Sequence, residues 1–171
     1  GVRVINLSED EASFDSYIRD LSGTYFHYMF EQKNMGTDTP RFSGSFIQEY
    51  LVANWDDKRW DQEMEILKEA GMKYLVYAPA LLVNEQGKFG TNYPSTLSKK
   101  KMQNKTLEKC LHSAQKNGVK VFVGLNFNDR WWKFDYDADW LFGQMEIGNR
   151  VADEIVALYK EKYPDAMYGW D

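Results

Sequence analysis

The feature that most constrains the fold is a regular alternation of short β-rich segments with amphipathic helical segments. Residues with high strand propensity run over 41–52, 73–83, 119–126 and 165–171, and apolar residues at helical spacing separate these runs. Strands that alternate with helices in this way predict an α/β fold. Its sheet would be parallel, and its connections would be right-handed crossovers.

The predicted helices carry recognisable start and stop signals. Asp56 is expected to cap the first helix, and Gly71 to end it. Thr106 is expected to cap the second helix, which would end at Gly118. A third helix is predicted over 138–163, where apolar residues again recur at helical spacing.

The length of each unit favours a barrel. Residues 41–171 number 131, or about 33 for each of four units, and a (β/α)₈ barrel of about 250 residues spends roughly 31 on each. We therefore predict the first half of a (β/α)₈ TIM-type barrel, truncated at strand four, in which the polar segment 84–105 is a long loop. An open four-stranded parallel sheet with helices on both faces is the alternative, because spacing alone does not separate the two.

Residues 1–40 are predicted to form an N-terminal extension, because their charge and pattern differ from the rest. They hold seven acidic and three basic residues, whereas 41–171 hold 19 and 18. An aromatic stretch over 22–30 is expected to be extended, and the turn-rich run 34–40 marks the boundary. The first residues lack the apolar core of a signal peptide.

Composition and charge exclude several classes of function. No apolar run approaches the roughly 18 residues of a membrane span. The net charge of −5, without a long basic block, argues against a nucleic-acid partner. One cysteine, Cys110, excludes an internal disulfide and is expected to be a buried hydrophobe. With only two histidines besides, we expect no metal and no cofactor.

Polar side chains follow the predicted strands at their carboxyl ends, where α/β proteins gather functional residues. Because side chains alternate along a strand, one face carries small residues below and amides or carboxylates at the rim. We interpret this face as the barrel interior. Its members are Gly44, Gln48, Gly124, Asn126, Asn128, Gly169 and Asp171.

Amides beside tryptophans suit a carbohydrate, since a sugar offers hydroxyls to hydrogen-bond and C–H faces to lie against rings. The expected ligand is therefore a glycan or a small carbohydrate. The candidate substrate-binding residues are Gln48, Asn126, Asn128, Asp129, Trp131, Trp132, Trp170 and Tyr77.

These residues also have purely structural interpretations. Gln48 and Asn126 would then pin loops through hydrogen bonds to the backbone. The tryptophans at 131 and 132 would cover the edge of the core, and Asp129 would form a local ion pair with its neighbour Arg130.

Cleavage of a glycosidic bond needs two carboxylates, and Asp171 and Glu49 are the candidates for this catalytic acid/base role. Strand alternation places Glu49 on the face opposite Gln48, where it would pair with a helix residue. A glycan-binding or scaffold protein without catalysis is therefore a second hypothesis. A redox or nucleotide-binding open sheet is a third, but the sequence lacks a glycine-rich phosphate loop, a serine elbow and an HExxH motif.

Three segments carry a resemblance to a known family: SGSFIQ at 43–48, KEAGMKYL at 68–75 and YGW at 168–170. Over residues 42–171 the sequence resembles the bacterial family catalogued as domain of unknown function 4434. Its members look like glycoside-hydrolase-type TIM barrels and are common among secreted or surface proteins of gut Bacteroides-type bacteria.

The resemblance implies a (β/α)₈ fold, a role with carbohydrate and an extracellular, periplasmic or cell-surface location. By analogy with sugar-cleaving barrels, an acid/base carboxylate would follow strand four and a nucleophile would stand on a later strand.

A half-barrel would expose two edge strands and an apolar interior. We therefore expect it to be completed by a second copy, by a separate chain, by a missing C-terminal half, or by residues 1–40 packing across an edge.

Overall fold

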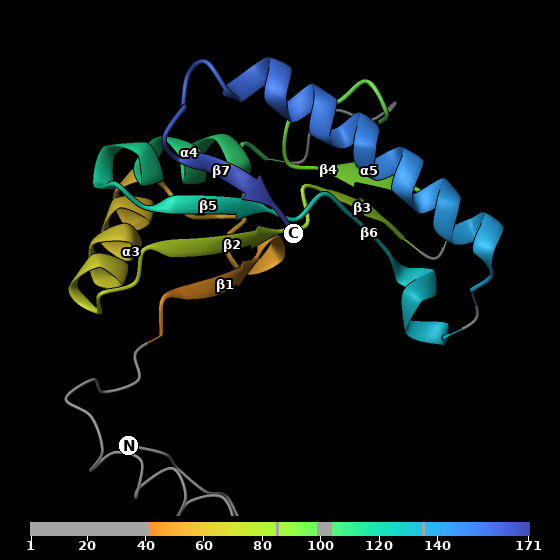
Figure 1. Ribbon diagram of the computed structural model, residues 1–171, viewed down its shortest axis with the longest axis horizontal. Helices are drawn as coiled ribbons and strands as arrows, with labels where there is room; N and C mark the ends of the chain where they lie inside the picture. Colours follow the sequence, from red (N-terminus) through yellow and green to blue (C-terminus); the bar gives the residue numbers. More distant parts are fainter. Residues whose placement is uncertain (1–41, 85, 99–103, 135) are drawn as a thin grey trace, which may run out of the picture. The chain divides into compact units, whose positions relative to one another are not determined.

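The structure, a computed structural model, describes residues 42–171 apart from 85, 99–103 and 135. The extension predicted over 1–40 lies outside the described residues. Four strands form the main sheet in the order β1-β2-β5-β7, and every neighbouring pair is parallel (Figure 1). Their bounds are β1 Gly44–Gln48, β2 Tyr74–Ala78, β5 Lys120–Val123 and β7 Met167–Trp170.

The three helices that connect these strands all pack on one face of the main sheet. They are α3 (Asp57–Glu69), α4 (Thr106–Asn117) and α5 (Ala138–Tyr159). Their apolar sides and alternate residues of the strands form one buried cluster. Its members include Trp60, Met64, Leu75, Tyr77, Leu107, Leu111, Val121, Val123, Val151 and Ile155.

Sequential strand order together with helices on one face is the winding of a (β/α)₈ barrel, not that of a doubly wound sheet. The predicted half-barrel is therefore confirmed, and the alternative with helices on both faces is wrong for the described residues.

The opposite face of the sheet carries a row of aromatic side chains. The ring of Phe122 lies 6.0 Å from that of Tyr74 and 5.2 Å from that of Tyr168. Phe46 and Tyr168 remain 54% and 51% exposed. This face corresponds to the interior of a barrel, and the described part of the chain leaves it open.

A second, smaller sheet lies beyond the carboxyl ends of the main strands. It has the order β4-β3-β6, with β3 antiparallel to β4 and parallel to β6. The bounds are β3 Leu81–Val83, β4 Phe89–Thr91 and β6 Asn126–Asn128. The segment 84–105, predicted to be a loop, therefore contains a strand.

Three predicted strands are wrong in extent. The strand predicted over 41–52 ends at Gln48, where a 3₁₀ turn begins, and 73–83 and 119–126 each divide into two strands. Pro79 lacks an N–H and so interrupts the ladder of the main sheet. The backbone N–H of Ala80 then donates to Gly124 O at 2.7 Å, which starts the smaller sheet. The segments that follow β2 and β5 thus leave the main sheet together and pair again as β3 and β6.

The helix boundaries agree with the sequence in part. Asp56 caps α3 as predicted, because its side chain accepts from the N–H of Arg59 at 2.8 Å. Thr106 is not a cap but the first residue of α4; Lys105 holds the cap position. The side chain of Asn104 instead accepts from the N–H of Thr106 at 3.0 Å. Helix α5 ends at Tyr159, four residues before the predicted end.

Cys110 is fully buried in α4, as expected, and burial raises the pKa of its thiol. Within the ranges that the structure describes, no helix is both long and apolar enough to cross a bilayer.

Candidate functional site

A cleft of about 550 Å³, here called the strand cleft, opens at the carboxyl ends of β1, β2 and β5. Pro79 and Gly124 are among the residues that line it. Six of the ten predicted site residues line it: Gln48, Glu49, Asn126, Asp129, Trp132 and Asp171. Residues far apart in the sequence are thus brought together at the carboxyl ends of the parallel strands, where the sequence predicts them.

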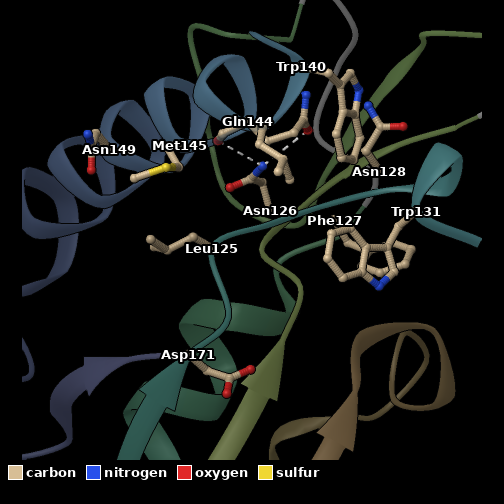
Figure 2. Close-up of a pocket in the computed structure, with 12 residues that line it drawn as sticks. Leu125, Asn126, Phe127, Asn128, Trp131, Trp140, Gln144, Met145, Asn149 and Asp171 are labelled. Atoms are coloured by element: carbon tan, nitrogen blue, oxygen red, sulfur yellow. Dashed lines mark hydrogen bonds between the residues drawn. The ribbon is translucent and has the colours of Figure 1, made fainter. Parts of the chain in front are cut away.

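A second cleft of about 660 Å³, here called the helix cleft, lies between β6 and α5 (Figure 2). Two further predicted residues, Asn128 and Trp131, line it. Helix α5 contributes Trp140, Gln144 and Asn149, which the sequence analysis missed. The two clefts share four lining residues: Leu125, Asn126, Phe127 and Asp171.

The segment from β6 into the short helix η3 (Asp129–Lys133) separates the two clefts. Asn128 lines the helix cleft and the next residue, Asp129, lines the strand cleft. Trp131 and Trp132 divide in the same way. Successive residues of a 3₁₀-helix point about 120° apart, because the helix has 3.0 residues per turn. Adjacent tryptophans of η3 therefore serve different clefts.

Each of the three predicted amides is held by one of its polar atoms. Gln48 Oε1 accepts from Tyr50 Oη at 2.7 Å, and Asn128 Oδ1 accepts from the N–H of Arg130 at 3.0 Å. Asn126 Nδ2 donates to the carbonyl of Gln144 at 3.3 Å (Figure 2).

The other atom of each amide bonds to none of the described residues. These atoms are Gln48 Nε2, Asn126 Oδ1 and Asn128 Nδ2. The structural and the ligand-binding interpretations are therefore compatible. One atom fixes the side chain, and the other can meet a ligand hydroxyl.

The two tryptophans present substantial ring surface to solvent, with Trp131 40% and Trp132 67% exposed. The ring of Trp131 is stacked on Tyr136 at 4.6 Å and lies 6.3 Å from Trp140. Trp132 packs against Phe127 at 5.4 Å. Both rings are held by aromatic neighbours, and neither is simply a cover over the core.

Three carboxylates line the strand cleft. Glu49 is the first residue of a 3₁₀ turn, η2 (Glu49–Leu51), so the prediction that it faces away from Gln48 is wrong. The strand alternation ends where this turn begins. Partial burial raises the pKa of Glu49. The chain continues β7 as far as Asp171, whose N–H donates to Val123 O at 3.1 Å.

Arg130 is predicted to pair with Asp129. Its Nη2 atom lies 3.5 Å from the carboxylate of Asp137. Its guanidinium carbon lies 5.1 Å from the ring centre of Trp140. This places the cation toward the start of α5.

Two predicted residues lie outside both clefts. Tyr77 is fully buried on the helix-covered face, where its ring lies 6.3 Å from that of Trp60, and burial raises the pKa of its hydroxyl well above the usual value. A ligand on the open face cannot reach it, which corrects the prediction. Trp170 pairs in register with Val123 and lines neither cleft.

Parallel strands wound in sequence order, with polar residues at their carboxyl ends, define the class of the chain: part of a TIM-type (β/α)₈ barrel, with its candidate site at the carboxyl face of the sheet. The chain belongs to the family described as Domain of unknown function (DUF4434), which matches residues 42–171. The resemblance noted from the sequence is thereby confirmed. No curated protein matches the chain.

Similar solved structures come from Bacteroides thetaiotaomicron. One, described provisionally as an alpha-L-fucosidase, is 23% identical with a TM-score of 0.61 over 78% of this chain. A GH29 alpha-L-fucosidase trapped as a covalent intermediate is 14% identical with a TM-score of 0.42 over 71% of this chain. The chain spans 41% and 29% of their lengths. At 23% identity, the first likeness shows the fold alone.

Proposed function

We propose that the strand cleft binds a glycan. The observation that carries the proposal is the convergence of one exposed indole, two amides and three carboxylates in a single cleft at the strand ends. Ligand sites combine apolar or aromatic walls with a few convergent polar groups, and this cleft has that composition. Trp132 would support the C–H face of a pyranose, while Gln48 and Asn126 would bond its hydroxyls.

Calorimetric titration of the protein with a panel of glycans tests this function. The panel begins with fucose-containing oligosaccharides, because the solved structures that resemble this chain are described as fucosidases. Trp132→Ala should weaken binding roughly tenfold, the scale of a lost aromatic contact. Phe142→Ala is the matched control, since Phe142 is an exposed aromatic residue outside both clefts. If no glycan binds, the proposal fails.

Hydrolysis is a second candidate, favoured by the raised pKa of Glu49 beside other carboxylates of the strand cleft. A carboxyl group whose burial favours its protonated form suits a general acid, and Asp171 would be the second carboxylate. Glu49→Gln and Asp171→Asn should then each abolish cleavage of aryl glycosides while binding persists. Binding without turnover by the unaltered protein would favour a purely glycan-binding role.

We also propose that further βα units complete the barrel over the open sheet face. The exposed rings of Phe46 and Tyr168 support this, as do the edges of β1 and β7, which pair with no other described strand, and the 41% coverage of the first solved structure. Dye binding to apolar surface should be strong for residues 42–171 expressed alone. A well-behaved monomer of that fragment without such binding would contradict the proposal.

A further inference from the structure

We infer that the ligand is an oligosaccharide whose neighbouring sugar units occupy the strand cleft and the helix cleft, with Asn126 at the junction. This inference rests on the proposed glycan binding in the strand cleft and adds the number of sugar units and the second compartment.

The first argument is that the clefts are adjacent. Their common residues, Leu125, Asn126, Phe127 and Asp171, form a shared boundary, so a chain leaving one compartment can enter the next. Volumes of about 550 and 660 Å³ are each in the range of sites for small molecules. A single monosaccharide would fill one compartment and leave the other empty.

The second argument is that the helix cleft has its own means of recognising a sugar. The ring of Trp131 is nearly parallel to that of Tyr136, with an interplanar angle of 6°, and this stacking holds the indole in place before a ligand arrives. Amides of Gln144 and Asn149 line the same cleft. The aromatic and amide combination of the strand cleft is therefore repeated with different residues.

The two compartments differ in charge. Of the described residues that line the helix cleft, only Asp171, at the boundary, is charged, whereas the strand cleft also holds Glu49 and Asp129. An uncharged sugar unit therefore suits the helix cleft. The carboxylates that hydrolysis would require all line the strand cleft.

Asn126 connects the two compartments. Its Nδ2 atom is anchored to α5 through Gln144, and its Oδ1 atom accepts from none of the described residues. A side chain that lines both clefts with a free acceptor can bond a hydroxyl next to the linkage between two sugar units.

The test compares monosaccharides with oligosaccharides by calorimetry on the whole protein. The probes are L-fucose with fucosyllactose, D-xylose with xylobiose, and D-mannose with mannobiose. At least one oligosaccharide should bind roughly tenfold or more tightly than its monosaccharide, the scale of one added aromatic contact. Trp131→Ala and Asn149→Ala should reduce this gain, so that the oligosaccharide binds little more tightly than its monosaccharide. Trp132→Ala should weaken both.

The outcomes separate the inference from the function on which it rests. If every oligosaccharide binds no more tightly than its monosaccharide, or if both helix-cleft variants leave the gain intact, a two-compartment ligand is excluded while glycan binding stands. If no probe binds at all, the proposed function fails as well. Asn149 is exposed on α5, so its variant tests the compartment without disturbing the aromatic stack.

Discussion

A Cβ atom on Gly148 would lie 2.8 Å from Oδ1 of Asn126. Helix α5 therefore approaches β6 closely because residue 148 has no side chain. The same approach lets Asn126 reach the carbonyl of Gln144, one turn earlier on the helix. The glycine thus sets the position of the amide that both clefts share.

Gly148→Ala should weaken glycan binding roughly tenfold while changing the free energy of unfolding by less than about 1 kcal/mol. Alanine favours a helix interior by about 1 kcal/mol over glycine, and this gain opposes the strain of displacing Asn126. Calorimetry would measure the affinity, and urea unfolding would measure the stability.

Gly143→Ala, on the same helix, is the control for this substitution. A Cβ at Gly143 meets no atom within 4 Å, so the variant should gain up to about 1 kcal/mol and bind normally. Equal affinities for the two alanine variants would show that Gly148 does not position Asn126.

Glu49→Gln should stabilise the protein near neutral pH. Burial raises the folded-state pKa of Glu49 above its ordinary value of 4.5, so ionising this group is harder in the folded state. Its contribution to stability is therefore full below that ordinary value and is lost as the pH rises through the folded pKa. The glutamine variant avoids this loss, and its advantage should disappear below about pH 4.

Thermal unfolding measured from about pH 3, below the ordinary carboxyl pKa, to about pH 8 would give this difference in stability. Glu146→Gln, a neutralisation at an exposed position of α5 outside both clefts, should not reproduce the pattern. If Glu49→Gln is less stable than the unaltered protein at neutral pH, the carboxylate makes a favourable contact that outweighs its desolvation.

The sequence predicted the half-barrel because strand and helix periodicities are local, and four strand patterns alternate with three helix patterns. It also predicted which residues gather at the strand ends, since parallel strands place their carboxyl ends at one edge of the sheet. Eight of the ten predicted site residues line at least one of the two clefts.

The errors arose where the chain leaves regular structure. Alternation beyond Gln48 failed because a 3₁₀ turn begins at Glu49. The breaks at Pro79 and Gly124 depend on pairing between segments more than 40 residues apart, which local patterns do not contain. Trp140 was missed because a single helix face does not reveal which strand it will cover. A glycine inside a helix, as at 148, was the available signal.

Gly124→Ala should destabilise the fold by about 1–3 kcal/mol, the usual cost of overpacking a core. Its added methyl group would overlap the side chain of Ala78 on the neighbouring strand and stand 3.5 Å from Asp171 Oδ2. Urea unfolding would measure the loss. Gly87→Ala is an unsuitable control because its φ of 71° itself disfavours alanine, so Gly143→Ala again serves. Unchanged stability would mean that the two strands separate at little cost.

A single carboxylate on α5 holds the segment that follows β4. Glu154 accepts from Tyr93 Oη at 2.7 Å, from Ser95 Oγ at 2.6 Å and from the N–H of Thr96 at 2.9 Å, and it also accepts from Thr96 Oγ1. Desolvation raises the pKa of Glu154, but the hydrogen bonds from Ser95, Thr96 and Tyr93 together outweigh it, and the net pKa is lowered.

Glu154→Ala should cost about 2 kcal/mol near neutral pH, since it removes hydrogen bonds to a charged acceptor. A lowered folded-state pKa gives stability that is present above the ordinary value of 4.5 and is lost as the pH falls through the folded pKa. The difference between the variant and the unaltered protein should therefore shrink as the solution is acidified below that value. Glu154→Gln keeps an acceptor oxygen and should lose less. A cost that stays constant down to about pH 3 would show that packing, not the charge, secures this segment.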